Sequence, residues 1–166
     1  MVLEGRASCR SLTLLRREGT GFERPRFWRM KPHRRILKQP VVLLVEDEPL
    51  VRLTQVDILR EAEFWVVEAQ DADEAFELLK ARPDISAVLT DVNMPGSIDG
   101  FEFARLVRQG WPEVGVLVIS GKTGPGPGDL PPDASFLHKP VRPAALVAAL
   151  QEVMATRANG SLTPET

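Results

Sequence analysis

The 166-residue sequence has few of the features that would direct a protein to a membrane or out of the cell. It contains one cysteine, Cys9, so no disulfide can form within the chain, and with only two histidines a transition-metal cage is not expected. No apolar run approaches the roughly 18 to 20 residues that a membrane-spanning helix requires. The N-terminal part also lacks the apolar centre of a secretory signal. These absences favour a globular protein of the reducing cytoplasm with no membrane partner.

Charge divides the sequence into two parts of opposite balance. Residues 1–40 carry 11 Lys and Arg against 3 Asp and Glu, whereas residues 41–166 carry 10 against 20. The basic part has no sustained apolar period and contains scattered Gly and Pro, which predicts a disordered N-terminal extension over residues 1–39. We expect one domain over residues 40–157, followed by a disordered tail over residues 158–166.

The basic extension has several interpretations. An electrostatic contact with nucleic acid or another acidic surface fits its composition, and so does an organelle transit peptide. The simplest interpretations are a disordered tail, or a start of translation placed too early, because Met30 would begin a shorter chain just ahead of the first apolar segment. Nucleic acid is therefore not an expected partner.

Beyond residue 40, five short apolar segments alternate with amphipathic ones. The first, VVLLV, is continuously apolar and β-branched, as is typical of a strand buried on both faces. Pro49 then stands where a helix can begin, and Asp71 with Glu74 three residues later is typical of a helix N-terminus. The predicted strands are residues 41–45, 64–69, 86–91, 114–120 and 136–139. The predicted helices begin at Pro49, after Asp71, at Gly100 and at Pro143.

This alternation predicts an α/β fold. Because crossovers between parallel strands are right-handed, the strands should form a doubly wound, five-stranded parallel sheet with helices on both faces. In such folds the functional crevice lies at the carboxyl ends of the strands. Polar residues follow four of the predicted strands: Glu46, Asp47 and Glu48 after the first, Asp91 after the third, Ser120 after the fourth and Lys139 after the fifth.

The chemistry of these residues indicates a phosphoryl site. Three consecutive carboxylates repel one another and raise one another's pKa unless a cation lies beside them. Carboxylate oxygens are ligands that Mg²⁺ prefers. With the metal present, one carboxylate can attack phosphorus while the metal, an ammonium and a hydroxyl share the charge on the phosphoryl oxygens. Lys139 and Ser120 would supply the ammonium and the hydroxyl.

Four motifs resemble the receiver domain of two-component response regulators, over essentially all of residues 41–155. LLVEDEPLVR resembles the acidic pair of that family, VLTDVNMPGSIDGFEF its phosphoacceptor segment, VLVISG its hydroxyl strand and FLHKP its lysine strand. Asp91 follows Asp47 by 44 residues, as in the family pattern. The resemblance implies a flavodoxin-like receiver fold.

The resemblance also implies the roles of the site residues. A histidine kinase or phosphotransfer protein would phosphorylate Asp91 in the presence of Mg²⁺. The implied metal-binding residues are Glu46, acting through water, Asp47, Asp91 and Asn93, the last through its backbone carbonyl. Ser120 would then bond the phosphoryl group, Phe136 would turn inward in step, and the Lys139–Pro140 bond would be cis.

The sequence departs from the family pattern between the fourth and fifth strands, where the family has a helix. Here the chain reads KTGPGPGDLPPDA, and prolines at roughly 3 kcal/mol each, with glycines at about 1 kcal/mol, do not fit a helix interior. We therefore expect helix 4 of the family to be degenerate or absent. The loop in its place is expected to be mobile or remodelled by phosphorylation.

The residues after Arg157 are too few for an output module, which predicts a stand-alone receiver. Its phosphorylated face would be read by another, unknown protein, or it would drain phosphoryl groups from a kinase, and a homodimer is left open. It would not be an enzyme beyond its own phosphorylation and dephosphorylation. Two alternatives are a phosphorylation-independent binding module and a haloacid-dehalogenase-like phosphatase. The phosphatase would need a second acid at the position of Asn93.

Overall fold

The structure is a computed structural model that describes residues 39–121 and 124–160. The predicted N-terminal extension, apart from its last residue, and residues 161–166 of the predicted tail lie outside the described residues. Within the described ranges, no helix is both long and apolar enough to cross a membrane.

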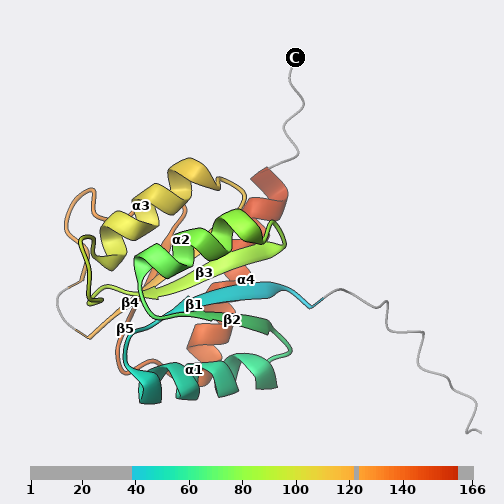
Figure 1. The fold of residues 1–166 in the computed structure, drawn as a ribbon. Helices are drawn as coiled ribbons and strands as arrows, with labels where there is room; N and C mark the ends of the chain where they lie inside the picture. Colours follow the sequence, from blue (N-terminus) through green and yellow to red (C-terminus); the bar gives the residue numbers. More distant parts are fainter. Residues whose placement is uncertain (1–38, 122–123, 161–166) are drawn as a thin grey trace, which may run out of the picture. The chain divides into compact units, whose positions relative to one another are not determined.

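In the described residues, five parallel strands form a single sheet in the order β2-β1-β3-β4-β5, with four helices packed on it (Figure 1). The strands are β1 (Val41–Val45), β2 (Trp65–Ala69), β3 (Ile85–Asp91), β4 (Gly115–Ser120) and β5 (Ser135–His138). The helices are α1 (Pro49–Glu61), α2 (Ala72–Ala81), α3 (Gly100–Gly110) and α4 (Pro143–Gly160). The predicted doubly wound parallel sheet is confirmed.

Local signals in the sequence account for where the helices begin. Pro49 occupies the first turn of α1, where its missing N–H removes no intrahelical hydrogen bond. At the start of α2, the Asp71 side chain accepts a hydrogen bond from the Glu74 N–H at 2.8 Å. Asp99 caps α3 in the same way, accepting from the Glu102 N–H at 2.8 Å. α4 ends at Gly160, beyond the predicted Arg157.

Side chains that alternate along the central strands divide the core into two layers. Val41, Leu43 and Val45 of β1 face the helices α2 and α3, whereas Val42 and Leu44 face α1 and α4. Figure 1 shows α2 and α3 on one side of the sheet and α1 and α4 on the other. Because both faces are covered, β1 is buried along its whole length, as its continuous apolar run predicts.

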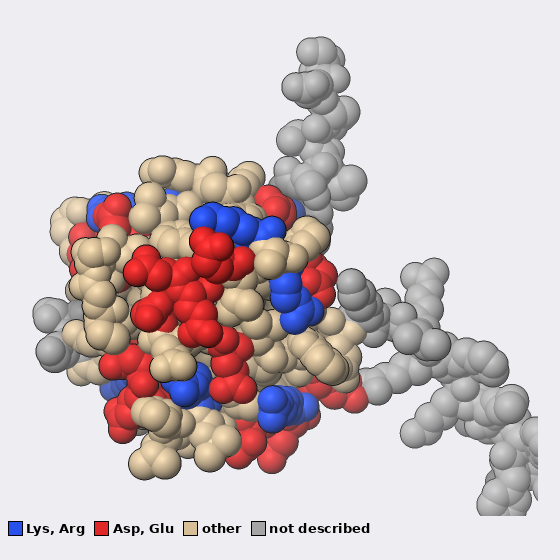
Figure 2. All heavy atoms as spheres, in the orientation of Figure 1, with Lys and Arg blue, Asp and Glu red and all other residues tan. Residues whose placement is uncertain are grey.

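The acidic balance of residues 41–166 is visible at the surface. Figure 2 shows a band of Asp and Glu side chains across the face in view, with few Lys or Arg side chains between them.

The connection between β4 and β5 contains no helix in residues 124–134, so the predicted loss of this helix is confirmed for the described part. Ion pairs and apolar packing hold the connection instead. Leu130 packs against the core. Asp133, in the left-handed conformation with φ 64°, lies 3.2 Å from Arg157 Nη1 of α4 and 3.9 Å from Arg108 Nη2 of α3.

Candidate functional site

The carboxyl ends of β1, β3 and β4 each carry a buried polar side chain. Glu46 directly follows β1, Asp91 is the last residue of β3 and Ser120 is the last residue of β4. Glu46 is only 2% exposed. Groups of this kind are rarely buried unless a partner compensates them, so their surroundings decide what the site can do.

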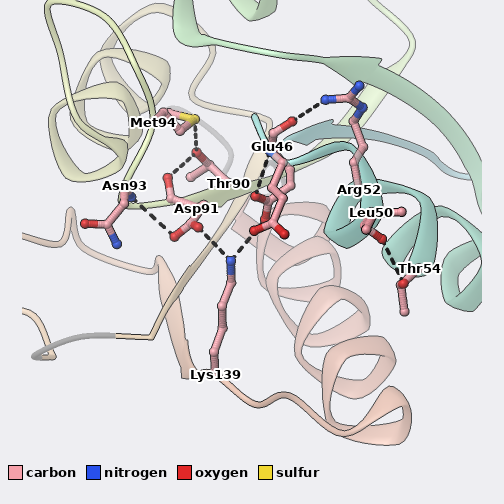
Figure 3. A network of polar contacts seen from close by, with 10 residues as sticks. Glu46, Leu50, Arg52, Thr54, Thr90, Asp91, Asn93, Met94 and Lys139 are labelled. Atoms are coloured by element: carbon pink, nitrogen blue, oxygen red, sulfur yellow. Dashed lines mark hydrogen bonds and ion pairs between the residues drawn. The ribbon is translucent and has the colours of Figure 1, made fainter.

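Lys139 supplies the compensating charge. It follows β5 directly, and its backbone N–H donates to the Ser120 carbonyl at 2.8 Å, which continues the pairing of β5 with β4. Its Nζ lies 2.6 Å from Asp91 Oδ2 and 3.0 Å from Glu46 Oε2 (Figure 3). One ammonium therefore joins two carboxylates from separate strand ends. The Lys139–Pro140 peptide bond is cis, as predicted.

Burial and ionic contacts shift the pKa values of this cluster in opposite directions. Burial raises the pKa of Glu46, and Asp91 adds to the shift, even though Lys139 opposes it. Burial lowers the pKa of Lys139, but the hydrogen bonds to Asp91 and Glu46 and the attraction of their charges together outweigh burial, so the net shift of that pKa is upward. One ammonium thus serves two carboxylates, and burial still favours the neutral form of Glu46.

The donor set fits a hard divalent cation such as Mg²⁺. In the described part of the chain, no three or more His, Cys, Asp or Glu side chains are already grouped as a metal site. However, Glu46 and Asp91 both contact the same cationic group, so both offer oxygen atoms to one region of space. Carboxylate oxygens in small number are the ligands that Mg²⁺ takes in proteins.

The other predicted metal-binding residues flank these two. The Asn93 N–H donates to Asp91 Oδ1 at 3.3 Å, so Asn93 lies beside the predicted acceptor. Asp47 follows Glu46 and is exposed, and among the described residues no hydrogen bond or ion pair joins its carboxylate to the cluster. The structure therefore brings Glu46, Asp91 and Asn93 together and leaves Asp47 at the rim.

The two predicted switch residues lie on neighbouring strands. Ser120 is buried at the end of β4, and Phe136 is half-buried in β5. The Phe136 ring stacks on Phe101 of α3, with centroids 6.3 Å apart, and forms a T-shaped pair with the His138 ring, with centroids 4.8 Å apart. Phe136 is thus in contact with the helix that follows β3.

Three residues that contact the site were not identified from the sequence as site residues. The Thr90 hydroxyl donates to the Asp91 carbonyl at 2.9 Å, and Arg52 Nη1 donates to the Glu46 carbonyl at 2.6 Å. Gly100 begins α3 so close to Asp91 that a Cβ atom there would lie 2.1 Å from the Asp91 carbonyl oxygen. The sequence marks Gly100 only as the start of a predicted helix. It gives no signal for Arg52 other than its position in LLVEDEPLVR.

A match to a family model shows which protein family the chain belongs to. A family model described as "Response regulator receiver domain" matches residues 42–151. The chain belongs to this family. The predicted receiver identity is confirmed, and with it the assignment to two-component signalling. Receiver domains are phosphoacceptors rather than enzymes that turn over a substrate.

Individual receivers agree with this assignment. The response regulator receiver protein CpdR of Brucella abortus is 31% identical over 116 residues, which cover 68% of this chain and 95% of CpdR. The hydrogenase transcriptional regulatory protein HoxA of Cupriavidus necator is 44% identical over 89 residues, 52% of this chain, but the chain spans only 17% of the length of HoxA. A crystal structure of a receiver protein from Sinorhizobium medicae superimposes with a TM-score of 0.68 at 30% identity, covering 73% of this chain and 98% of that one.

Proposed function

We propose that this receiver accepts a phosphoryl group on Asp91 from a histidine kinase or phosphotransfer protein, in a reaction that requires Mg²⁺. The single observation that carries the proposal is the contact of Lys139 Nζ with both Asp91 and Glu46. A lone buried pair of carboxylates would be costly, whereas carboxylates held around one ammonium form an environment in which anionic oxygens are stabilised.

In the proposed reaction a carboxylate oxygen of Asp91 forms a bond to phosphorus. The bond between phosphorus and the donor histidine nitrogen breaks, and the imidazole leaves with the electron pair and takes up a proton. Lys139 remains beside the acceptor and balances charge on the phosphoryl oxygens. The Asn93 N–H, 3.3 Å from Asp91 Oδ1, holds the carboxylate in one orientation.

The residues that would hold Mg²⁺ are Glu46, Asp47, Asp91 and the backbone carbonyl of Asn93. When bound, the metal would supply positive charge to the phosphoryl oxygens. The carboxylate oxygens that Glu46 and Asp91 present around one cationic group support this part of the proposal.

The proposed output is a change of surface. A phosphoryl group on Asp91 replaces the single negative charge of the carboxylate with a charge of nearly −2, at the edge of the sheet where β4 ends in Ser120. The Ser120 hydroxyl would bond that group, and Phe136 would move inward as β4 and its neighbours adjust. Such a change selects among conformations that the domain already visits. Another protein would then bind the phosphorylated form.

The proposal is tested by incubating the chain with Mg²⁺ and acetyl phosphate and measuring its intact mass. We expect one added phosphoryl group, removed by acid or base, that Asp91→Asn abolishes and that requires far more Mg²⁺ in Asp47→Ala. Asp73→Asn, an exposed acid on α2, is the matched control and should accept phosphate like the unaltered chain. Modification that persists in Asp91→Asn would contradict the proposal.

A further inference from the structure

An arginine on α1 reaches back to the acidic loop, which we define as Glu46, Asp47 and Glu48. Arg52 stands on the first turns of α1, and its Nη1 donates to the backbone carbonyl of Glu46 at 2.6 Å (Figure 3). Its side chain is only 16% exposed, so this contact is shielded from water. A charged donor on a carbonyl at this distance is among the stronger hydrogen bonds in proteins.

The same guanidinium is anchored on a second strand. Arg52 Nε lies 3.4 Å from Glu68 Oε2 of β2. Glu68 is also approached by Arg60, at 3.9 Å, from the solvent side of α1. Because the guanidinium is planar and presents its donors in a fixed fork, contacts at two of its nitrogens fix its position as well as its charge.

The carbonyl that Arg52 binds belongs to the peptide unit between Glu46 and Asp47. That unit is planar, so the direction of its C=O sets the backbone orientation from which Asp47 departs. The backbone N–H groups of the loop bond on either side: the Glu46 N–H donates to the Ala69 carbonyl at 3.2 Å, and the Glu48 N–H donates to Glu46 Oε1 at a long 3.4 Å. Neither of these hydrogen bonds holds the carbonyl group of that peptide.

We propose that Arg52 is a positioning residue for the metal-binding loop, acting through the Glu46 carbonyl to orient Asp47 toward the cation. The inference rests on the proposed function, because Asp47 is assigned there as a metal ligand. A positioning role explains why the positively charged Arg52 lies beside a loop of three carboxylates that is proposed to bind Mg²⁺. A residue that only added positive charge there would weaken the binding of Mg²⁺.

Charge and geometry therefore predict opposite results. If Arg52 acted only through its charge, Arg52→Gln would bind Mg²⁺ more tightly and Arg52→Lys would match the unaltered chain. If Arg52 positions the loop, both substitutions lose the forked contact and both weaken binding. Substitution of residues that hold the metal ligands in place commonly weakens metal binding by 10-fold to 100-fold, and we expect the affinity for Mg²⁺ to fall about 10-fold here.

The test is a titration of the full chain with MgCl₂, followed by the NMR shifts of backbone amides in the acidic loop and at Asn93. The unaltered chain, Arg52→Lys, Arg52→Gln and Arg60→Gln are compared. Arg60→Gln is the matched control, because Arg60 contacts Glu68 but not the Glu46 carbonyl, and its dissociation constant should stay within about twofold. Tighter binding by Arg52→Gln, or unchanged binding by Arg52→Lys, would overturn the inference.

A second variant separates positioning from folding. Glu68→Gln removes the anchor of Arg52 and leaves its bond to Glu46, so it should weaken Mg²⁺ binding less than Arg52→Lys does. Thermal unfolding without metal is measured on every variant. A lower melting temperature in Arg52→Lys with an unchanged dissociation constant would assign Arg52 a purely structural role and overturn the inference.

Phosphorylation by acetyl phosphate distinguishes the inference from the proposed function. In Arg52→Lys, the rate at low Mg²⁺ should fall and the rate at saturating Mg²⁺ should return close to that of the unaltered chain. If the unaltered chain is phosphorylated on Asp91 while the Arg52 variants bind Mg²⁺ as it does, only the inference fails. If the unaltered chain shows no response to Mg²⁺, both fail.

Discussion

The carboxyl edge of the sheet and the connection between β4 and β5 differ in how strictly their residues are constrained. At the edge, Lys139 Nζ contacts two carboxylates that are almost fully buried. In the connection, Asp133 makes its ion pairs while 49% exposed, and a turn is closed by Asp129, which accepts from the Gly126 N–H at 2.6 Å. Substitutions at the edge therefore disturb largely buried charges, whereas the connection has only to bridge two strands.

This difference in constraint explains why the side chains at the sheet edge do not require a helix between β4 and β5. β5 is held in register by its pairing with β4, from Leu117 opposite Ser135 to Ser120 opposite His138. This pairing, rather than the connection that precedes it, positions Lys139. A segment rich in Pro and Gly can then replace a helix at that place in the chain.

The largest effect is expected from Lys139→Met, which leaves Glu46 and Asp91 buried without their cation. Breaking a buried ion pair at one partner costs about 3 to 5 kcal/mol, and with Lys139 26% exposed we expect about 3 kcal/mol in the free energy of unfolding. Phosphorylation should also be lost. Urea denaturation in the absence of metal measures the change. Lys80→Met, which removes an exposed ion pair with Glu77, should cost less than about 1 kcal/mol.

The next effect tests the close approach of α3 to the acceptor strand. Gly100→Ala would place a Cβ atom 2.1 Å from the Asp91 carbonyl oxygen, so backbone must shift and stability should fall by about 2 kcal/mol. The residues that follow Asp91 should move with the shifted backbone, and phosphorylation should slow. At Gly110 no atom lies within 4 Å of an added Cβ, so Gly110→Ala should be neutral or stabilising by about 0.5 kcal/mol. Equal losses in the two variants would contradict this account.

A smaller effect concerns pH. The pKa of Glu46 is raised in the folded state above its ordinary value of 4.5, mainly by burial. The folded state therefore binds this proton more tightly than the unfolded state does. Stability from Glu46 is fully present below about pH 4.5 and is lost as the pH rises through the folded-state pKa. Urea denaturation of the metal-free chain at several pH values should show this loss, and Glu46→Gln should lack it.

The smallest effect is expected in the connection. Asp133→Asn keeps a residue that tolerates the left-handed conformation and removes the ion pairs with Arg157 and Arg108. Because these pairs are partly exposed, stability should fall by about 0.5 kcal/mol, and less at high salt. Phosphorylation should proceed at the rate of the unaltered chain. A loss as large as that of Lys139→Met would remove the distinction between the two regions.

Much of the fold could be predicted because local and global signals agree. The apolar run Val41–Val45 marks a strand covered on both faces, and Asp71 with Glu74 marks the start of α2. The polar residues at the ends of β1, β3 and β5 could be identified because parallel strands bring their carboxyl ends to one edge. The order of the elements alone places these residues at that edge.

The features that could not be predicted depend on tertiary contacts between side chains and between elements. Arg52 has a long side chain that turns back to the Glu46 carbonyl, and nothing in its spacing separates it from a solvated arginine. Gly100 is required by the approach of α3 to Asp91, which arises from the packing of a helix on the sheet. Asp133 takes a left-handed conformation in a segment for which the sequence predicts only the absence of a helix.

The central claim is that Asp91 is the residue that receives the phosphoryl group. The most direct test is to treat the chain with Mg²⁺ and acetyl phosphate, reduce it with borohydride, which converts an aspartyl phosphate to homoserine, and sequence the peptides by mass spectrometry. The account predicts homoserine at position 91, dependent on Mg²⁺ and absent from the untreated chain. Homoserine at another position, or at none, would contradict it.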